Sequence, residues 1–176
     1  MNLIFRLIKV VLMALMRPRL PLLGDSVVRF LVWPHDLDLN LHMNNGRYLT
    51  IMDLGRTDLF FRTGMARAAW RGRWQPMLAA TTIRYRRPLA PFKRYELHSR
   101  MLAWDEKWFF MEQRFEVGGD LFAYALIKGV LVGRQDKIPP AQLARTVGHD
   151  GTSPEMPPQL SAWLSWEKPG SDLNGI

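Results

Sequence analysis

The residue pattern changes from a helical period to a period of two near Gly72, and this change restricts the fold more than any other feature of the sequence. Between Gly46 and Thr63, apolar residues recur at helical spacing and cover most of the predicted helix, so we expect other structure to wrap it. Gly64 suits the end of that helix. The segments that follow alternate between apolar and polar residues, or run apolar throughout, as β-strands do; we place them at 76–86, 94–101, 109–117 and 121–132.

A further strand is predicted before the helix, at 27–33, where β-branched and aromatic residues dominate. A loop rich in Asp and Asn, from Pro34 to Asn45, joins this strand to the helix. The order of strand, loop, helix and then strands suited to an antiparallel meander indicates an α+β fold. We expect one apolar helix to lie across a curled antiparallel sheet.

The length of 176 residues fits one domain with short extensions, and 48% hydrophobic residues exclude a wholly disordered chain. We divide the chain into an N-terminal helix and linker (1–26), a main domain (27–135) and a Pro-rich C-terminal extension (136–176). The absence of cysteine excludes disulfides, thiolate metal sites and a Cys nucleophile. The histidines do not pair at metal-ligand spacing, so no metal is expected.

The first residues predict a short apolar helix. Residues 3–16 are apolar except for Arg6 and Lys9, and Pro18 and Pro21 follow. Such a helix spans about 21 Å at ~1.5 Å per residue, less than the roughly 30 Å hydrocarbon core of a bilayer. No small-x-small cleavage site follows it. The helix is therefore expected to lie in a membrane interface or to pack on the protein or a partner subunit, with a signal anchor as a third reading.

The formal net charge is +8, and the excess is strongest from Arg56 to Arg94, where ten basic residues accompany Asp58 alone. Such a surface attracts nucleic acid, anionic lipid or a phosphorylated cofactor, and charge alone does not choose among them. The sequence shows no nucleic-acid-binding module, so we expect no nucleic-acid partner. It also lacks a P-loop, a Gly-x-Ser-x-Gly elbow and the Rossmann glycine pattern.

The residues that suit chemistry are concentrated in the loop before the central helix and in the helix itself. The pattern reads Asp38-x-Asn40-x-His42-Met43-Asn44-Asn45-x-x-Tyr48, followed by Asp53 and Arg56. It resembles the hot-dog-fold acyl thioesterases, the superfamily of 4-hydroxybenzoyl-CoA thioesterase and the acyl-ACP thioesterases, and especially its thioesterase-like branch. The resemblance covers roughly Val27 to Arg134, and the two ends of the chain fall outside it.

The resemblance implies a hot-dog fold, in which an antiparallel sheet wraps around one long central helix, and hydrolysis of acyl-CoA or acyl-ACP. In the families resembled, the Asp that matches Asp38 is the catalytic carboxylate, and the acyl-ACP branch also uses the residues that match Asn40 and His42. Such proteins build their sites at a subunit interface, so we expect a homodimer or tetramer. No cofactor is expected beyond the CoA or ACP that the substrate carries.

The residues themselves suit this chemistry. Thioester hydrolysis needs a base or nucleophile near a group that holds the carbonyl oxygen. Asp38 is the expected carboxylate, and Asn40 and His42 are expected to orient the water, the carboxylate or the carbonyl. A helix that begins near residue 45 offers unpaired N–H groups and the positive end of its dipole to an oxyanion. The expected oxyanion and substrate contacts are Asn45, Gly46 and Arg47.

Structural roles remain open for the same residues. One Asn of the 44–45 pair is an expected helix N-cap. Asp38 is able to brace an Asx turn, and His42 to hydrogen-bond within the loop. Asp53 either pairs with Arg56 three residues later or contributes to the site together with it.

We therefore expect a thioester hydrolase whose Arg-rich stretch Arg67–Arg94 meets the phosphates of CoA or an acidic carrier protein. The competing hypothesis is a non-catalytic acyl- or lipid-binding protein of the same fold at a membrane surface, which it contacts through residues 1–20. The expected location is the cytoplasm, with peripheral contact to an inner membrane as an option.

Overall fold

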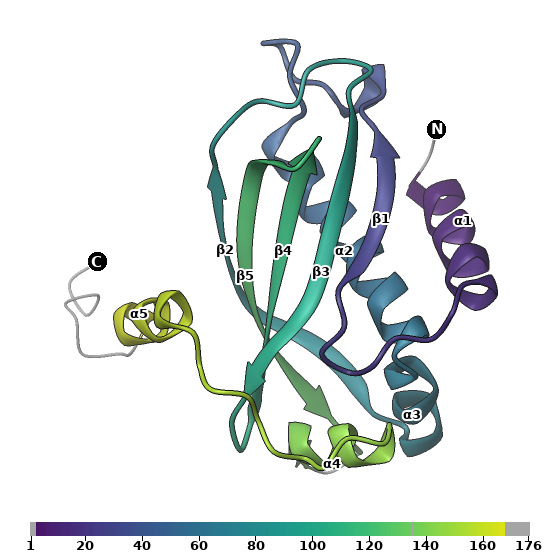
Figure 1. Ribbon diagram of the computed structural model, residues 1–176, viewed down its shortest axis with the longest axis vertical. Helices are drawn as coiled ribbons and strands as arrows, with labels where there is room; N and C mark the ends of the chain where they lie inside the picture. Colours follow the sequence, from purple (N-terminus) through teal and green to yellow (C-terminus); the bar gives the residue numbers. More distant parts are fainter. Residues whose placement is uncertain (1–2, 135, 168–176) are drawn as a thin grey trace.

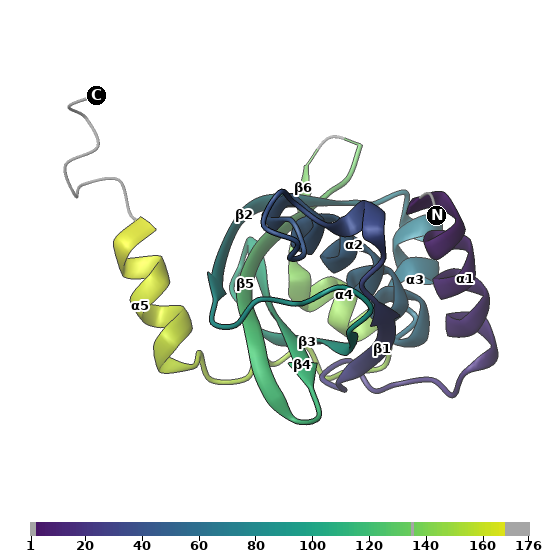
Figure 2. The ribbon, with the colours of Figure 1, turned by 90° about the horizontal axis from the view of Figure 1, so that it is seen from above.

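A six-stranded antiparallel sheet curls around helix α2 (Asn45–Arg62) in the computed structural model of this chain (Figures 1 and 2). The structure describes residues 3–134 and 136–167. Residues 1–2 of the predicted N-terminal segment and residues 168–176 of the predicted C-terminal extension lie outside the described residues.

The strands run along the sheet in the order β1-β3-β4-β5-β2, and β6 pairs with β5. Their bounds are β1 (Ser26–Leu31), β2 (Gln75–Tyr85), β3 (Arg94–Trp104), β4 (Trp108–Val117), β5 (Asp120–Val132) and β6 (Lys137–Ile138). The predicted meander is confirmed for β3, β4 and β5, but it is wrong for β2, which pairs with β5 instead of β3. The connection over residues 86–93 contains two prolines and is too long for a tight hairpin, so β2 and β3 lie apart in the sheet.

Helix α2 packs on the inner face of the sheet, as its apolar period predicts (Figure 1). Ile51 and Leu59 are fully buried in this contact. Gly55 lets the helix approach the sheet closely, because a Cβ there would lie only 2.6 Å from the Ser99 Oγ on β3. The expectation of a buried central helix is therefore confirmed.

Helix α1 (Leu3–Met16) covers the side of α2 that faces away from the sheet (Figure 2). It buries Arg6, Val10 and Ala14, which recur at helical spacing on one face. This face shows that α1 packs on the protein, one of the readings that the sequence left open. Among residues 3–134 and 136–167, no helix has the length and apolar character needed to cross a bilayer.

Helix α3 (Met65–Gly72) is an element that the residue pattern does not predict. Gly64, with a φ of 81°, follows the end of α2 as expected, but the chain begins a new helix at once. Only Met65 and Ala68 of α3 are buried, so its apolar period is too short to be recognised in the sequence.

The segment after β6 adds two short helices. Helix α4 (Pro140–Thr146) and helix α5 (Pro158–Glu167) both begin at a proline within the Pro-rich C-terminal extension. Leu160 of α5 packs with Ala103 and Phe110 in a small apolar cluster, separate from the core around α2. Helices α1 and α5 consequently lie on opposite sides of the molecule (Figure 2).

Candidate functional site

The loop between β1 and α2 contains a tight turn that Asp38 organises. The Asp38 N–H donates to the His42 carbonyl at 2.8 Å, and Leu37 and Met43 form an isolated antiparallel bridge. One carboxylate oxygen of Asp38, Oδ1, accepts the N–H of Asn40 at 2.9 Å and that of His42 at 3.3 Å. The other oxygen, Oδ2, accepts no hydrogen bond from the described residues. Asp38 therefore braces the turn with one oxygen and leaves the second available.

The same turn presents its side chains to solvent. Asn40 and His42 are exposed, and Asp38 is partly buried. Leu41 has a φ of 57°, in the left-handed region that a leucine adopts only where its surroundings enforce it. The three residues that were predicted to be catalytic thus lie together on one exposed, conformationally constrained turn.

Asp36 differs from Asp38 because it is buried, with 1% exposure. Its Oδ2 accepts the Trp33 N–H at 2.9 Å and pairs with the buried guanidinium of Arg6 on α1 at 2.5 Å. Arg47, in the first turn of α2, lies 3.3 Å from Asp36 Oδ1 and donates to the His35 carbonyl at 3.2 Å. Asp36 therefore attaches the loop to both helices, and the Arg47 side chain is engaged in that attachment.

The N-terminus of α2 follows directly after the Asp38 turn. Asn44 is its N-cap, because the Asn44 Oδ1 accepts the Gly46 N–H at 2.8 Å. The N–H of Asn45 has no hydrogen-bond partner among residues 3–134 and 136–167. Above Gly46 the surface is open, since an added Cβ would meet only the Asn44 Oδ1 within 4 Å. The free N–H of Asn45 and the positive end of the α2 dipole therefore follow the Asp38 carboxylate within a few residues of sequence.

The C-terminal end of β2 lies beside this helix end. The Tyr85 hydroxyl donates to the Asn45 carbonyl at 3.3 Å. The Tyr85 ring packs edge-on against the buried Tyr48, with ring centroids 4.9 Å apart. Burial raises the pKa of Tyr48 to about 12, so its hydroxyl stays protonated at physiological pH. Strand β2 therefore helps to form the surroundings of the α2 N-terminus.

The basic stretch Arg67–Arg94 forms two separate groups in the fold. Arg84 and Arg86 flank Tyr85 and lie near the candidate site. Arg67 and Arg71 belong to α3, which follows the other end of α2. The 18 residues of α2 extend for about 27 Å at ~1.5 Å per residue, so the two groups are separated by roughly that length. The two groups therefore lie toward opposite ends of α2.

Asp53 and Arg56 lie about two turns farther along α2. Asp53 is 65% exposed and pairs with Arg56, which confirms the structural pairing at this spacing. The Arg56 Nη1 donates to the Gln113 Oε1 at 2.8 Å, and the Gln113 Nε2 donates to the Ser99 Oγ at 2.7 Å. Burial lowers the pKa of Arg56, and the charge of Asp53 opposes that shift. Arg56 therefore joins α2 to the sheet, and Asp53 pairs with it on the helix.

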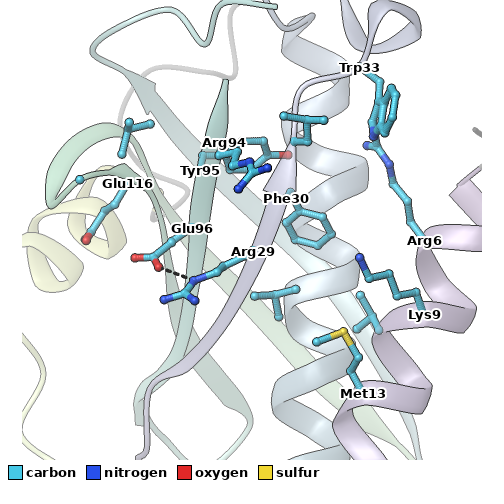
Figure 3. A pocket seen from close by; sticks show the side chains of 15 residues that line it. Arg6, Lys9, Met13, Arg29, Phe30, Trp33, Arg94, Tyr95, Glu96 and Glu116 are labelled. Atoms are coloured by element: carbon cyan, nitrogen blue, oxygen red, sulfur yellow. Dashed lines mark hydrogen bonds and ion pairs between the residues drawn. The ribbon is translucent and has the colours of Figure 1, made fainter. Parts of the chain in front are cut away.

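Two hollows are lined by residues outside the Asp38 turn. An apolar cavity of about 310 Å³ at the far end of α2 is bordered by Phe60, Met65 and Trp74, a lining that suits an alkyl chain. A more polar groove of about 680 Å³ runs between α1 and β1; Figure 3 shows Lys9 and Met13 projecting from α1 toward it. Among the described residues, no group of three His, Asp or Glu side chains could hold a metal ion.

The predicted site residues thus separate into a compact group around Asp38 and the more distant pair on α2. Reading the sequence does not find Arg6, Asp36 or Tyr85 as parts of the site's framework. Tyr85 and Arg6 come from distant segments, so local spacing carries no signal for their contacts. A signal for Arg6 does exist, because an arginine inside an otherwise apolar helix requires a partner if it is buried.

Comparison with known proteins identifies the family. The family model for the thioesterase-like superfamily matches residues 32–164, which include the Asp38 turn, strands β2 to β6 and α4. The chain belongs to the thioesterase-like superfamily. The residues that match the family model extend past Arg134, where the resemblance seen in the sequence ends. Protein THEM6 of Xenopus laevis is 36% identical over 153 residues, which is 85% of this chain and 72% of that protein.

Solved structures of the superfamily share the fold. The probable thioesterase YbaW from Escherichia coli gives a TM-score of 0.66 at 20% identity, and the match covers 72% of this chain and 98% of that one. Slr0204, a 1,4-dihydroxy-2-naphthoyl-CoA thioesterase from Synechocystis, gives 0.61 at 15% identity, with 70% and 95% covered. The fold is the hot-dog fold of these thioesterases, as the sequence resemblance implied.

Proposed function

We propose that this protein hydrolyses acyl thioesters of CoA or acyl carrier protein, with Asp38 as the base or nucleophile. The observation that carries the proposal is the position of the Asp38 turn directly before the N-terminus of α2, where a carboxylate with one free oxygen precedes a free backbone donor in the same segment of the chain. Membership of the thioesterase-like superfamily supports the reaction class. The shared fold of a structure described as a CoA thioesterase supports the type of thioester.

In the proposed reaction, the carbonyl oxygen of the thioester lies at the N-terminus of α2. A water molecule adds to the carbonyl carbon while the free Oδ2 of Asp38 takes one of its protons. The carbon–sulfur bond then breaks, and the proton passes to the departing thiolate, so the products are a carboxylic acid and a thiol. If Asp38 attacks directly, the same bond breaks, and water hydrolyses the resulting anhydride. Asn40 and His42 are proposed to orient the water or the carbonyl.

Backbone donors are proposed to hold the oxyanion that forms during this reaction. The Asn45 N–H is the first candidate because it has no hydrogen-bond partner among the described residues. Gly46 supplies the open surface, and its own N–H becomes a donor if the Asn44 side chain turns away. Arg47 is proposed to position the loop through Asp36, because its guanidinium is already committed there.

The substrate's phosphates or acidic carrier are proposed to meet Arg84 and Arg86. Both side chains are exposed and form no ion pair with any described residue. They flank Tyr85, whose hydroxyl contacts the first residue of α2. A guanidinium suits phosphate because its planar donors make paired hydrogen bonds. The substrate would carry its own CoA or ACP, and the proposal requires no further cofactor.

We also propose that the protein is at least a homodimer. Strand β2 is an edge strand that pairs with β5 alone within the described part of the chain, and Met77 and Leu78 on it are 52% and 56% exposed. A long edge with exposed apolar side chains is usually covered in soluble proteins, and a second copy paired along β2 would cover it. Light scattering should give twice the chain mass of 20.5 kDa or more. A monomer at micromolar concentration would contradict this part of the proposal.

A second candidate function is acyl binding without turnover. The observation that favours it is the hydrogen bond from the Gly46 N–H to Asn44, which removes one of the expected oxyanion donors. Release of free thiol from a panel of acyl-CoA and acyl-ACP substrates of different chain length separates the two functions. Thiol release supports the hydrolase, whereas tight binding with no release from any substrate supports the binding protein. The cytoplasmic location stays a prediction under either function.

A further inference from the structure

Helix α1 has a second apolar face, opposite the one that packs on α2. The outward side chains at the helical period are large and apolar, and all are substantially exposed. They are Ile4 (59%), Phe5 (63%), Ile8 (50%), Leu12 (54%), Leu15 (66%) and Met16 (78%). At about 100° per residue they occupy one sector of roughly 120°, with Lys9 at its border. A helix at the surface of a soluble domain normally turns polar residues to water, so this face indicates a contact surface.

Unpaired cations border this apolar face. Lys9 on α1, Arg19 just beyond it, and Arg67 and Arg71 on α3 form no ion pair with any described residue. The sequence has no acidic residue in 1–24 or in 59–95. The surface next to the C-terminal end of α1 is therefore positively charged and has no acidic groups from these segments.

The two helices share a continuous surface. A hollow of about 820 Å³ lies between them, and its lining includes Leu15 and Arg19 from the α1 side and Arg67, Trp70 and Arg71 from α3. Trp70 is 82% exposed. A tryptophan and several arginines beside an apolar helix match the composition that proteins place at the boundary between lipid headgroups and acyl chains.

Helix α1 is attached to the domain, so its outward face belongs to the folded surface. The buried Arg6 pairs with Asp36 under the candidate-site loop. At the other end, the Arg17 guanidinium donates to the Val27 carbonyl at 3.0 Å and lies 3.7 Å from Asp58. Figure 2 shows α1 as the outermost element on its side of the molecule.

We propose that the outward face of α1 and the exposed residues of α3 form a surface that docks on membranes rich in anionic lipid. The helix has 14 residues and extends for about 21 Å, so it would lie in the plane of the interface with its apolar face among the acyl chains. Lys9, Arg19, Arg67 and Arg71 would meet lipid phosphates. Because Arg6 attaches α1 to Asp36, docking would hold the candidate-site loop near the bilayer. Membrane docking does not require the proposed thioesterase activity.

Sedimentation of the full chain with vesicles tests the apolar part of this surface. Vesicles of equimolar phosphatidylcholine and phosphatidylglycerol should carry the protein down, and vesicles of phosphatidylcholine alone should carry less. Leu12→Glu should lower the ratio of bound to free protein on the order of tenfold, because a large apolar contact is lost and a repelling charge is added. The matched control is Trp166→Glu, which changes an exposed apolar residue of α5 on the opposite side, and it should stay within about twofold of wild type.

The charged part is tested by Arg67→Gln combined with Arg71→Gln. This double variant should lose much of the preference for anionic vesicles, whereas Lys107→Gln combined with Lys137→Gln removes the same charge from two other exposed residues and should keep it. Thermal unfolding verifies that each variant is folded. Absence of wild-type protein from both vesicle pellets would overturn the proposal, as would equal losses in Leu12→Glu and Trp166→Glu. If light scattering shows instead that Leu12→Glu alone lowers the oligomer mass, a second copy covers α1 and the membrane proposal is wrong.

Discussion

Replacing Arg6 by Met is expected to destabilise the fold and the candidate site together, because Asp36 then keeps a buried charge without its main partner. The Arg6 side chain is 5% exposed and the Asp36 side chain 1%, and their charged atoms lie 2.5 Å apart. Methionine fills much of the space of the arginine stem, so loss of packing contributes little to the change. The effect therefore reports mainly on the ion pair that connects α1 to the loop.

The expected magnitude follows from what Asp36 retains. Removing one partner of a buried ion pair costs about 3–5 kcal/mol. Asp36 keeps the Trp33 N–H at 2.9 Å and the Arg47 guanidinium at 3.3 Å, so we expect the lower end of that range. A loss of about 3 kcal/mol in the free energy of unfolding lowers Tm by about 6–12 °C in a chain of this size.

Urea unfolding of Arg6→Met, Asp36→Asn and the double variant measures this contribution. The double variant lacks both charges, so its loss should be smaller than the sum of the two single losses by about 2 kcal/mol. The reasoning would be refuted by a loss below about 1 kcal/mol in Arg6→Met, or by single losses that simply add.

Three further substitutions test other parts of the structure. The Tyr95 hydroxyl is buried without a hydrogen-bond partner among the described residues, and burial raises its pKa. Its contribution to stability is therefore complete below about pH 10 and is lost as the pH rises beyond that. Tyr95→Phe should change the unfolding free energy by less than about 1 kcal/mol at neutral pH, and it should reduce the alkaline loss of stability in urea titrations. Gly55→Ala should destabilise by about 1–3 kcal/mol in thermal unfolding, because its Cβ would lie 2.6 Å from a β3 side chain, and a stabilised variant would contradict the close packing of α2. Asp53→Asn should lower the free energy of unfolding by less than about 1 kcal/mol and leave turnover within a few-fold of wild type, because Asp53 is 65% exposed and pairs with Arg56. A loss of turnover near 100-fold would instead give Asp53 a catalytic role.

The sequence predicts those parts of the fold whose period is long and regular. The apolar stripe of α2 and the alternation of β3 and β4 each extend over many residues, so the burial of these elements follows from local pattern. The position of β2 does not follow, because its pairing with β5 depends on contacts between distant segments. Helix α3 escapes prediction because only two of its residues are buried.

In the candidate site, too, the local contacts follow from the sequence and the contacts between distant segments do not. Asp38, Asn40 and His42 are close in sequence, and the turn that joins them uses hydrogen bonds within five residues. The N-cap role of Asn44 also follows from local chemistry. The support from Arg6 comes from a helix thirty residues away, and no local rule distinguishes the buried Asp36 from the more exposed Asp38.

Turnover of Asp38→Asn tests the central proposal most directly. Asparagine keeps an Oδ1 that accepts the two N–H groups of the turn, so the fold and acyl-CoA binding should stay near normal. It is a poor proton acceptor, so thiol release from the best acyl-CoA substrate should fall on the order of 100-fold or more, with a smaller loss in His42→Ala. Asp36→Asn should instead lower Tm, since that carboxylate supports the loop. The assignment of Asp38 would be contradicted if Asp38→Asn kept turnover within a few-fold of wild type while a folded Asp36→Asn variant released no thiol.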